Sequence, residues 1–230
     1  MMMIIQFLLG ASLASFFNLV AVRRQRGESI VAPRSHCDCC GGQLKNFDLI
    51  PVFSYIILMG KCRYCKQKFS ANLFTVELAA GSVAAGLNLF EINCLYVGML
   101  IILIALSSFD IVDQTIPTDG IIMLLLVCGL SNTHPVQEIL IAILIYLLIQ
   151  FLNHHFSWMG SGDIDIYFCL WLALDIPSLL WQTFIACVAA LLYLIVAPWP
   201  KNSKIPFVPF ITIGFYLTHQ FQSILLPLIS

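Results

Sequence analysis

The chain has 230 residues, of which 60% are hydrophobic and only 10% are charged, and its mean hydropathy is +0.94. A soluble domain carries about a quarter charged residues, so this composition excludes a soluble fold and predicts an all-α polytopic membrane protein. The eleven Lys and Arg residues all fall within residues 23–68 and 201–204. Because cytoplasmic loops collect these residues, both stretches are predicted to face the cytoplasm.

The first apolar run, residues 4–22, is followed by Arg23, Arg24 and Arg26 and preceded by no basic residue. A signal peptide has the opposite order of charge. Although "SLA" resembles a cleavage site, we interpret residues 1–22 as a retained first transmembrane helix with its N-terminus outside.

About eight transmembrane helices are predicted, because each needs roughly 20 mainly apolar residues. They are expected at 4–22, 73–92, 94–112, 116–131, 136–153, 164–176, 178–197 and 206–227. With the N-terminus outside, an even number of spans also puts the C-terminus outside. The remaining organisation is a cytoplasmic loop at 23–72 and a seven-helix membrane domain at 73–230.

The cytoplasmic loop contains two pairs of cysteines, Cys37-x2-Cys40 and Cys62-x2-Cys65. Four thiolates at this spacing are typical of a tetrahedral Zn²⁺ site, and a site with four protein ligands is structural. Two disulfides or a redox pair are the alternatives, but the cytoplasm is reducing and a redox centre needs one pair. Cys39 could replace Cys40 as a ligand.

Ionisable residues within membrane spans are costly and are functional candidates by default. Several acids lie at or near the predicted cytoplasmic ends of their spans, namely Glu77, Asp110, Asp113, Asp119, Asp163 and Asp165. Two carboxylates brought together share a proton, so that one can activate water and the other can hydrogen-bond a scissile carbonyl. We therefore expect Asp110 to meet Asp163, although acids in membranes also serve ion pathways.

The stretch "GSGD" precedes the sixth span and ends in Asp163. Its two glycines leave the backbone free of side chains, so an extended peptide could approach it closely. Asp163 would stand at a helix N-terminus, where an anionic carboxylate is favoured.

Several motifs in the same order resemble the bacterial type IV prepilin peptidases, or leader peptidase/N-methyltransferases, of the GxGD intramembrane aspartyl protease family. "GASLASFFNLVAVR" resembles the first span of that family. The stretch from "PRSHCDCC" to "FTVELAAG" resembles its cysteine loop running into the second span. "FDIVDQTIP" and "GSGD" resemble its two catalytic segments.

This resemblance implies that Asp110 and Asp163 are the catalytic pair, with Asp113 as the alternative partner of Asp163. It implies cleavage of a basic leader from prepilins or pseudopilins, whose mature part begins with a hydrophobic helix, at the cytoplasmic edge of the bacterial inner membrane. Methylation of the new N-terminal amine would follow, with S-adenosylmethionine as donor. For the cofactor site we look to Glu77 and Gly81, which could equally be an interfacial anchor and a helix-packing contact. Apart from the substrate and the lipid bilayer no partner is implied, and no nucleic acid is expected.

The sequence departs from the family pattern in three places. Asp38 stands where the first cysteine motif commonly has proline, and Asp165 stands where a basic residue commonly follows the second aspartate. An extra acid there would hold the pair more protonated unless it points elsewhere. The interval between Asp110 and Asp163 is also short. Two alternatives remain open: a zinc-stabilised membrane transporter, and a peptidase that lacks methyltransferase activity.

Overall fold

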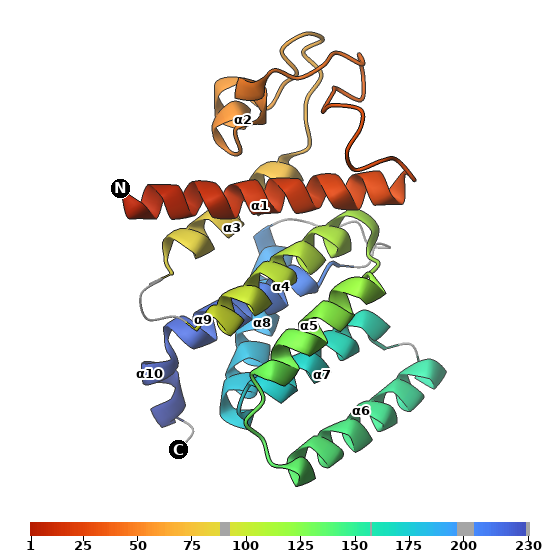
Figure 1. The fold of residues 1–230 in the computed structure, drawn as a ribbon, viewed down its shortest axis with the longest axis vertical. Coiled ribbons are helices and arrows are strands. Elements are labelled where there is room, and N and C mark those ends of the chain that lie inside the picture. The colour runs from red at the N-terminus through yellow and green to blue at the C-terminus, as the bar shows by residue number, and fades with distance from the viewer. Residues whose placement is uncertain (88–92, 157, 197–204, 229–230) are drawn as a thin grey trace. The chain divides into compact units, whose positions relative to one another are not determined.

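The computed structural model describes residues 1–87, 93–156, 158–196 and 205–228. These residues form helices and turns, with two isolated β-bridges and no strand among them. A helix occurs in each of the eight predicted spans, which confirms the all-α fold class (Figure 1). Four helices are long and apolar enough to cross a membrane, so the chain is an integral membrane protein. They are α1 (Met2–Gln25), α4 (Cys94–Asp113), α6 (Val136–Phe156) and α8 (Ile176–Val196).

Four shorter helices occupy the other predicted spans. They are α3 (Ala71–Ala85), α5 (Thr118–Leu130), α7 (Ser161–Ala173) and α9 (Val208–Gln220). At 1.5 Å per residue, 13 residues extend about 20 Å, which is less than the roughly 30 Å of a bilayer core. The last predicted span, residues 206–227, is broken at Phe221, where the backbone leaves the helical region. The short helices α10 (Gln222–Leu225) and η2 (Leu226–Leu228) follow.

The chain divides into two compact units, Met1–Glu91 and Ile92–Ser230. In the first unit, α1 packs along α3, and the cysteine loop between them carries η1 (Asn46–Leu49) and α2 (Phe53–Ile57). A Cβ atom added at Gly10 would lie 2.5 Å from the Cβ of Ala84. Because small residues line this contact, the two helix backbones approach closely. From the sequence, the first transmembrane helix is predicted to end at residue 22 and the cytoplasmic loop at residue 72. These boundaries between membrane and loop stay a prediction.

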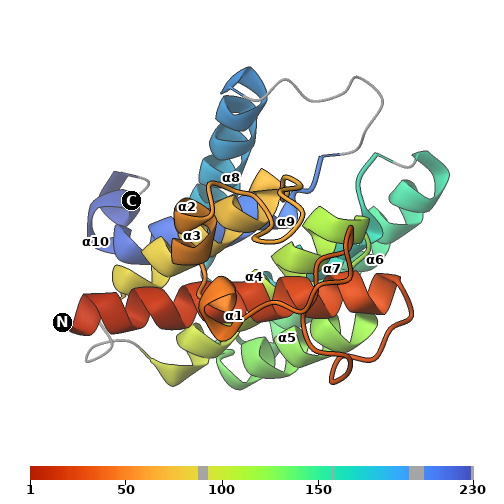
Figure 2. The same cartoon turned by 90° about the horizontal axis from the view of Figure 1, so that it is seen from above.

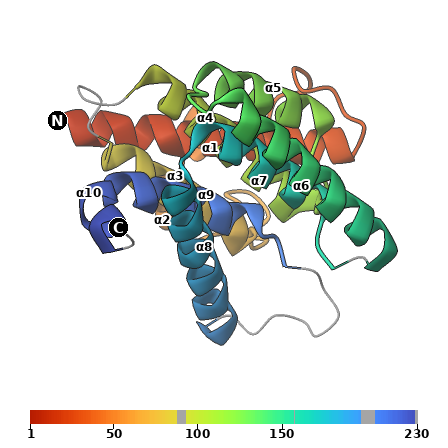
Figure 3. The same ribbon diagram turned by 90° about the horizontal axis from the view of Figure 1, so that it is seen from below.

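In the second unit, α4 packs against α5 and α9, while α7 packs against α5, α6 and α8 (Figures 2 and 3). The core side chains of α4 include Leu103 and Leu106, which are almost completely buried. In contrast, Ala142 alone is buried among the residues of α6, all of which the structure describes. Helix α6 therefore lies at the edge of this unit, and α4 with its neighbours α5, α7 and α9 carries the polar residues considered next.

Candidate functional site

Asp110 lies in the last turn of α4 and is buried, with 7% of its surface exposed. Its Oδ2 atom accepts a hydrogen bond of 2.9 Å from the backbone N–H of Val208, the first residue of α9. The first N–H groups of a helix have no partner within the helix, and they carry its positive dipole end. Asp110 therefore caps α9 from a different helix, and the capping fixes the orientation of its carboxylate.

A second polar contact, one turn further along, aligns α4 with α9. The hydroxyls of Ser107 and Thr212 lie 2.8 Å apart and are both buried. Each hydroxyl also lies within hydrogen-bond distance of a backbone carbonyl four residues earlier in its own helix, so that one hydroxyl donates to the other and the second donates to a carbonyl. Since all these groups are satisfied, the pairing holds the start of α9 at Asp110 without leaving a buried polar group unpaired.

Asp163 lies in the first turn of α7, which begins after Gly160. A Cβ atom at Gly162 would stand 2.5 Å from the Cδ1 and 2.8 Å from the Cβ of Ile116, in the segment between α4 and α5. Because Gly162 has no side chain, the start of α7 packs directly against Ile116, near the end of the "FDIVDQTIP" segment that contains Asp110. The sequence suggested that this glycine serves an approaching peptide, whereas here it accommodates a neighbouring part of the same chain.

The structure brings Asp110 and Asp163 close enough for their charges to interact. They come from different helices, and α5 packs against both of these helices. The sequence predicted this meeting but not the part played by Val208, because a backbone N–H leaves no mark in the residue pattern. In the sequence, the start of α9 was indicated only by Pro209, which follows a polar interruption of the apolar sequence. Proline in the first turn is typical of a helix start.

The nearby acids have other surroundings. Asp165 points toward α6, where its Oδ1 atom accepts hydrogen bonds of 2.9 Å from both the Tyr146 hydroxyl and the Gln150 amide. Asp113 is exposed at the end of α4 and accepts a hydrogen bond from the Thr115 hydroxyl. Asp165, which stands where the family pattern commonly has a basic residue, is therefore held by α6.

The four cysteines predicted as metal ligands lie together. The sulfur atoms of Cys37, Cys40, Cys62 and Cys65 are all within 4.8 Å of one another. The Sγ atoms of Cys37 and Cys65 are 3.8 Å apart. A Zn–S distance of about 2.3 Å separates tetrahedral sulfur ligands by about 3.8 Å. The residues therefore fit a tetrahedral metal ion such as zinc.

Two turns with the same geometry hold these thiols. Isolated bridges join His36 to Gln43 and Lys61 to Lys68, so that each cysteine pair sits in a tight hairpin. Backbone N–H groups of Cys65 and then Tyr64 lower the pKa of the Cys62 thiol to about 7. A lower pKa favours the thiolate, which is the form that binds metal.

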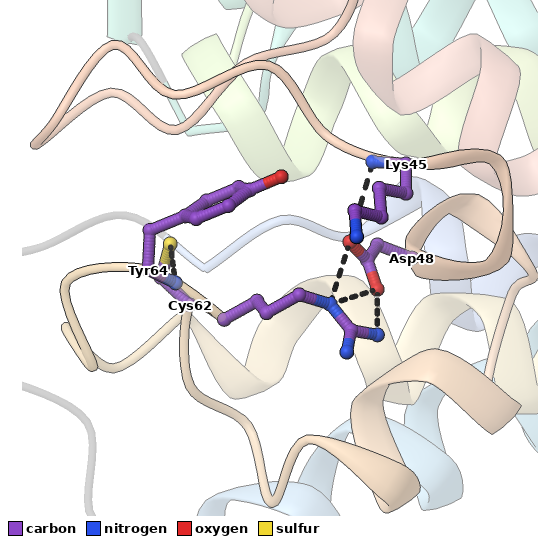
Figure 4. Close-up of polar contacts among 5 residues, drawn as sticks. Lys45, Asp48, Cys62 and Tyr64 are labelled. Atoms are coloured by element: carbon purple, nitrogen blue, oxygen red, sulfur yellow. Dashed lines mark hydrogen bonds and ion pairs between the residues drawn. The ribbon is translucent and has the colours of Figure 1, made fainter.

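An ion pair ties the second hairpin to η1. The Arg63 guanidinium donates to both carboxylate oxygens of Asp48, with the shortest contact at 2.6 Å, and the Lys45 backbone N–H donates at 3.2 Å (Figure 4). The Asp48 side chain is only 2% exposed. Arg63 lowers the pKa of this carboxyl. The loop is thus held by a charge pair as well as by its cysteines.

A cavity of about 500 Å³ lies within the first unit, lined by α1, the cysteine loop and α3. Its polar lining includes Ser15, Arg23, Asp48 and Glu77, and its aromatic lining includes Tyr55. Ligand sites for small molecules have volumes of about 300–1,000 Å³ and combine apolar walls with a few polar groups. The cavity therefore has the size and chemistry of a small-molecule site.

Glu77, predicted as part of a cofactor site, is 5% exposed and lines this cavity. Its Oε2 atom accepts a 2.8 Å hydrogen bond from the backbone N–H of Val52. Val52 has φ 64° and ψ −53°, and the Phe53 N–H donates to the Pro51 carbonyl, which together make a γ-turn with positive φ. This turn is rare and strained, above all for a β-branched residue. Glu77 therefore holds a strained turn at the cavity wall.

Gly81, the second residue predicted for the cofactor site, does not line the cavity. A Cβ atom added there would lie 2.7 Å from the Phe7 ring of α1. Its position is that of a helix-packing contact, one of the two roles that the sequence left open.

Arg23 was not predicted to have a role beyond its charge. It is 5% exposed and donates hydrogen bonds to the carbonyls of Ser29, Ile30 and Pro33, at 2.9, 3.0 and 2.6 Å. A single buried side chain thus fixes the first part of the loop against the end of α1. A basic residue after an apolar run indicates topology, and nothing in that pattern distinguishes an arginine that is buried.

Comparison with known proteins gives a consistent set of relatives. Residues 8–90 match the family model described as the Bacterial Peptidase A24 N-terminal domain. A Vibrio cholerae protein named Prepilin leader peptidase/N-methyltransferase is 30% identical over 178 residues, covering 67% of this chain and 70% of that protein. A Bacillus subtilis protein of the same name is 27% identical over 238 residues, covering 96% and 94%.

A Burkholderia pseudomallei protein, again of that name, is 31% identical over 209 residues. The alignment covers 81% of this chain but 66% of that relative, slightly less than two thirds of its length. No solved structure matches the chain.

Proposed function

Because the chain belongs to the family of prepilin leader peptidase/N-methyltransferases, we propose that it is a membrane-embedded aspartyl endopeptidase with a coupled N-methyltransferase activity. It removes the basic leader of type IV prepilins or pseudopilins and then methylates the new N-terminal residue. The observation that supports the peptidase half is that Asp110, in the last turn of α4, and Asp163, in the first turn of α7, lie close enough for their charges to interact.

The peptidase step uses the two carboxylates with one shared proton. One carboxylate takes a proton from a water molecule as the water oxygen bonds to the scissile carbonyl carbon, and the other hydrogen-bonds the carbonyl oxygen. The C–N bond then breaks, and a proton passes to the leaving amine. The N–H group of Val208 supports this reading, since it fixes one oxygen of Asp110 before the substrate arrives.

For the metal, we assign a structural Zn²⁺ to Cys37, Cys40, Cys62 and Cys65. Their mutual sulfur distances support the assignment. Four protein ligands leave no open position for a substrate, so the ion stabilises the loop and takes no part in the chemistry.

For the methyl donor, we assign S-adenosylmethionine to the cavity that Glu77 lines. The carboxylate of Glu77 on the cavity wall suits a cationic ligand, and the apolar walls suit an adenine ring. S-adenosylmethionine would supply an electrophilic methyl group there. Glu77 holds the Pro51–Phe53 turn, and Gly81 lets α1 pack close to α3, so both shape the cavity.

The proposed location is the bacterial cytoplasmic membrane, with both termini outside and the cleavage site at the cytoplasmic edge. The distribution of Lys and Arg supports this orientation. A basic leader would meet the acids near the end of α4 and the start of α7, while the hydrophobic helix of the substrate stays in the bilayer.

The test uses detergent-solubilised protein and a prepilin with its leader intact, with and without S-adenosylmethionine, and is read by intact mass. Asp110→Asn and Asp163→Asn are each expected to lower cleavage by at least about 10²–10⁴-fold, the contribution of a general acid or base. Asp113→Asn is the matched control, because it removes an exposed acid from the same helix, and it should retain cleavage.

Leader loss plus one methyl group in the wild type supports both activities. Leader loss without methylation reduces the proposal to a peptidase. Equal loss of cleavage in all three variants would contradict the assignment of Asp110 and Asp163, and no cleavage by folded, metal-loaded protein would remove the peptidase.

A further inference from the structure

One face of helix α6 carries a row of three polar side chains, those of Tyr146, Gln150 and Asn153. Spacings of four and three residues place them along the same side of the helix. Over residues 143–156, only these three and Ile145 are half-buried, and the rest are exposed. In a membrane, polar side chains between helices act by hydrogen-bonding across the interface. The row therefore marks the side of α6 that contacts the rest of the unit.

The partner of this row is the start of α7. The Tyr146 hydroxyl and the Gln150 amide both donate to Oδ1 of Asp165, at 2.9 Å each. Further along α6, the Asn153 side-chain amide donates to the Met159 carbonyl at 2.9 Å and accepts from the Met159 N–H at 3.0 Å. Met159 lies outside any helix, so Asn153 satisfies both of its backbone groups.

These contacts lie on either side of the "GSGD" segment, residues 160–163. Met159 immediately precedes it, and Asp165 is two residues beyond Asp163. Gly160 and Ser161 are exposed, so burial contributes little to holding the start of the segment. Because the residues before and after the segment are both tied to α6, this helix sets the position of the turn that carries Asp163.

The contact between α6 and α7 depends on these polar groups for its register. Helix α7 is the main neighbour of α6, which lies at the edge of the unit (Figure 1). Leu147, Leu148 and Phe151, beside the row, are each more than half exposed. The Tyr146 ring packs against Phe168 with the ring centroids 4.6 Å apart. Apolar surface exerts no directional force between helices in lipid, so the hydrogen bonds and this ring contact fix how α6 lies on α7.

A different role for Asp165 would be to offer its negative charge to the basic leader. The geometry favours a positional role, because the carboxylate is half-buried and is directed to α6. Its two hydrogen bonds from α6 end on one oxygen atom, Oδ1. The two roles therefore make different demands on the side chain: the positional role needs an acceptor oxygen, and the other role needs a charge.

We propose that Tyr146, Gln150 and Asn153 are positioning residues for peptide cleavage, which hold the "GSGD" segment so that Asp163 stays opposite Asp110. The inference rests on the peptidase activity proposed above. The three residues act through the segment and not on the substrate. A displacement of about 1 Å at a catalytic group can cost up to about 10²-fold in rate, so small movements of α7 against α6 matter.

The test measures kcat and KM for prepilin cleavage by the full-length protein in detergent, with thermal unfolding as the check on the fold. Asn153→Ala removes both hydrogen bonds to Met159. It is expected to lower kcat by about tenfold, within the range that a displaced catalytic group costs, while KM changes little. His154→Ala is the matched control, because it removes the neighbouring exposed side chain of the same helix, and it should keep the wild-type kcat.

Variants of Asp165 separate position from charge. Asp165→Asn keeps an acceptor oxygen without the charge, whereas Asp165→Ala removes both. We expect Asp165→Asn to lose clearly less kcat than Asp165→Ala. Tyr146→Phe and Gln150→Ala each remove one donor, and combining them with Asp165→Ala should lower kcat no further, because groups of one contact are not additive.

Hydrogen–deuterium exchange gives a readout that does not depend on activity. The Met159 N–H is held by Asn153, so Asn153→Ala should speed exchange in peptides that span residues 158–165. Exchange in peptides from α9 should stay as in the wild type. This pattern distinguishes release of one segment from a general loss of structure.

Unchanged kcat in Asn153→Ala, with a wild type that cleaves, would overturn the inference and leave the peptidase standing. Unchanged exchange over residues 158–165 would likewise show that α6 does not hold the segment. Equal losses in Asp165→Asn and Asp165→Ala would mean that Asp165 supplies charge and not an anchor for α6. No cleavage by the folded wild type would instead remove the peptidase itself, and the positioning role with it.

Discussion

The candidate metal ligands of Met1–Glu91 and the candidate catalytic pair of Ile92–Ser230 are built over very different distances along the chain. Cys37 and Cys65, whose sulfur atoms lie 3.8 Å apart, are separated by 28 positions. Asp110 and the N–H group that orients it are separated by 98 positions. The first site is specified by local hairpins, whereas the second exists only where packed helices bring their ends together.

This contrast predicts different kinds of failure. A substitution in the cysteine loop removes the structure of the site itself, because the ligands and the local fold depend on each other. A substitution in the helical unit can leave the fold intact and move one carboxylate, because larger packing surfaces hold the helices.

Among the substitutions considered, Cys62→Ser is expected to have the largest effect, on the metal content and structure of the cysteine loop. The variant loses one thiolate of a four-ligand set, so it should lose most of its metal and the loop should become sensitive to protease. Metal per chain by elemental analysis and limited proteolysis measure both. Cys39→Ser is the control, since Cys39 is exposed and outside the cluster. Full metal in Cys62→Ser, or equal loss in Cys39→Ser, would contradict the ligand set.

A smaller effect is expected for Gly162→Ala, which adds a methyl group 2.5 Å from the Ile116 side chain. The start of α7 must shift, and a displacement of about 1 Å at a catalytic group can cost up to about 10²-fold in rate. The measurement is the initial rate of prepilin cleavage alongside thermal unfolding, with the rate falling more than the stability.

Two companion variants sharpen this prediction. Gly129→Ala on α5 adds the same methyl group where no atom lies within 4 Å, and it should be neutral. Ile116→Gly combined with Gly162→Ala removes every Ile116 side-chain atom that the new methyl would meet, and it should recover part of the rate. A double variant no better than Gly162→Ala would mean that contact with Ile116 is not the cause.

The smallest effect is the pH dependence of the Asp48–Arg63 pair. The pKa of Asp48 is lowered in the folded loop by Arg63, so its stabilising contribution is present above the unfolded pKa of about 3.9 and is lost as pH falls through the folded value. The difference in loop stability between wild type and Asp48→Asn should therefore be constant near neutral pH and shrink below about pH 4. Chemical unfolding of the loop at several pH values measures it.

Asp38→Asn provides the comparison for this pair. Asp38 is paired with Arg26, but its side chain is 66% exposed. Exposed pairs contribute little to stability, so this variant should differ little from wild type at any pH. Equal effects of the two substitutions would show that burial of Asp48 is unimportant.

The residue pattern predicted what depends on composition and on local spacing. Apolar runs predicted where helices form, and the two C-x2-C pairs predicted a cluster of four thiols. The position of Phe221 shows the limit of this reasoning. The last apolar run continues through it, yet α9 ends there and a separate turn begins, because hydropathy does not record backbone conformation.

The orientation of individual acids was beyond the pattern for a related reason. From the sequence, Asp165 could have been a third acid beside Asp110 and Asp163. In the structure it instead accepts hydrogen bonds from Tyr146 and Gln150 of α6. The role of Glu77 likewise depends on a backbone N–H at Val52 in a strained turn. The donors to these carboxylates can belong to residues of many types, so no sequence motif predicts them.

The sequence by itself determined that the chain lies in a membrane and that the loop after its first helix has a metal-ligand pattern, and it predicted a catalytic pair from two aspartate segments. These features follow from hydrophobicity, spacing and residue chemistry, which are local properties. Only the tertiary structure decided which backbone group orients Asp110, which helix holds Asp165, and which turn Glu77 holds. Those outcomes depend on close packing between distant helices, where the position of each polar group is set by neighbours that the linear chain does not reveal.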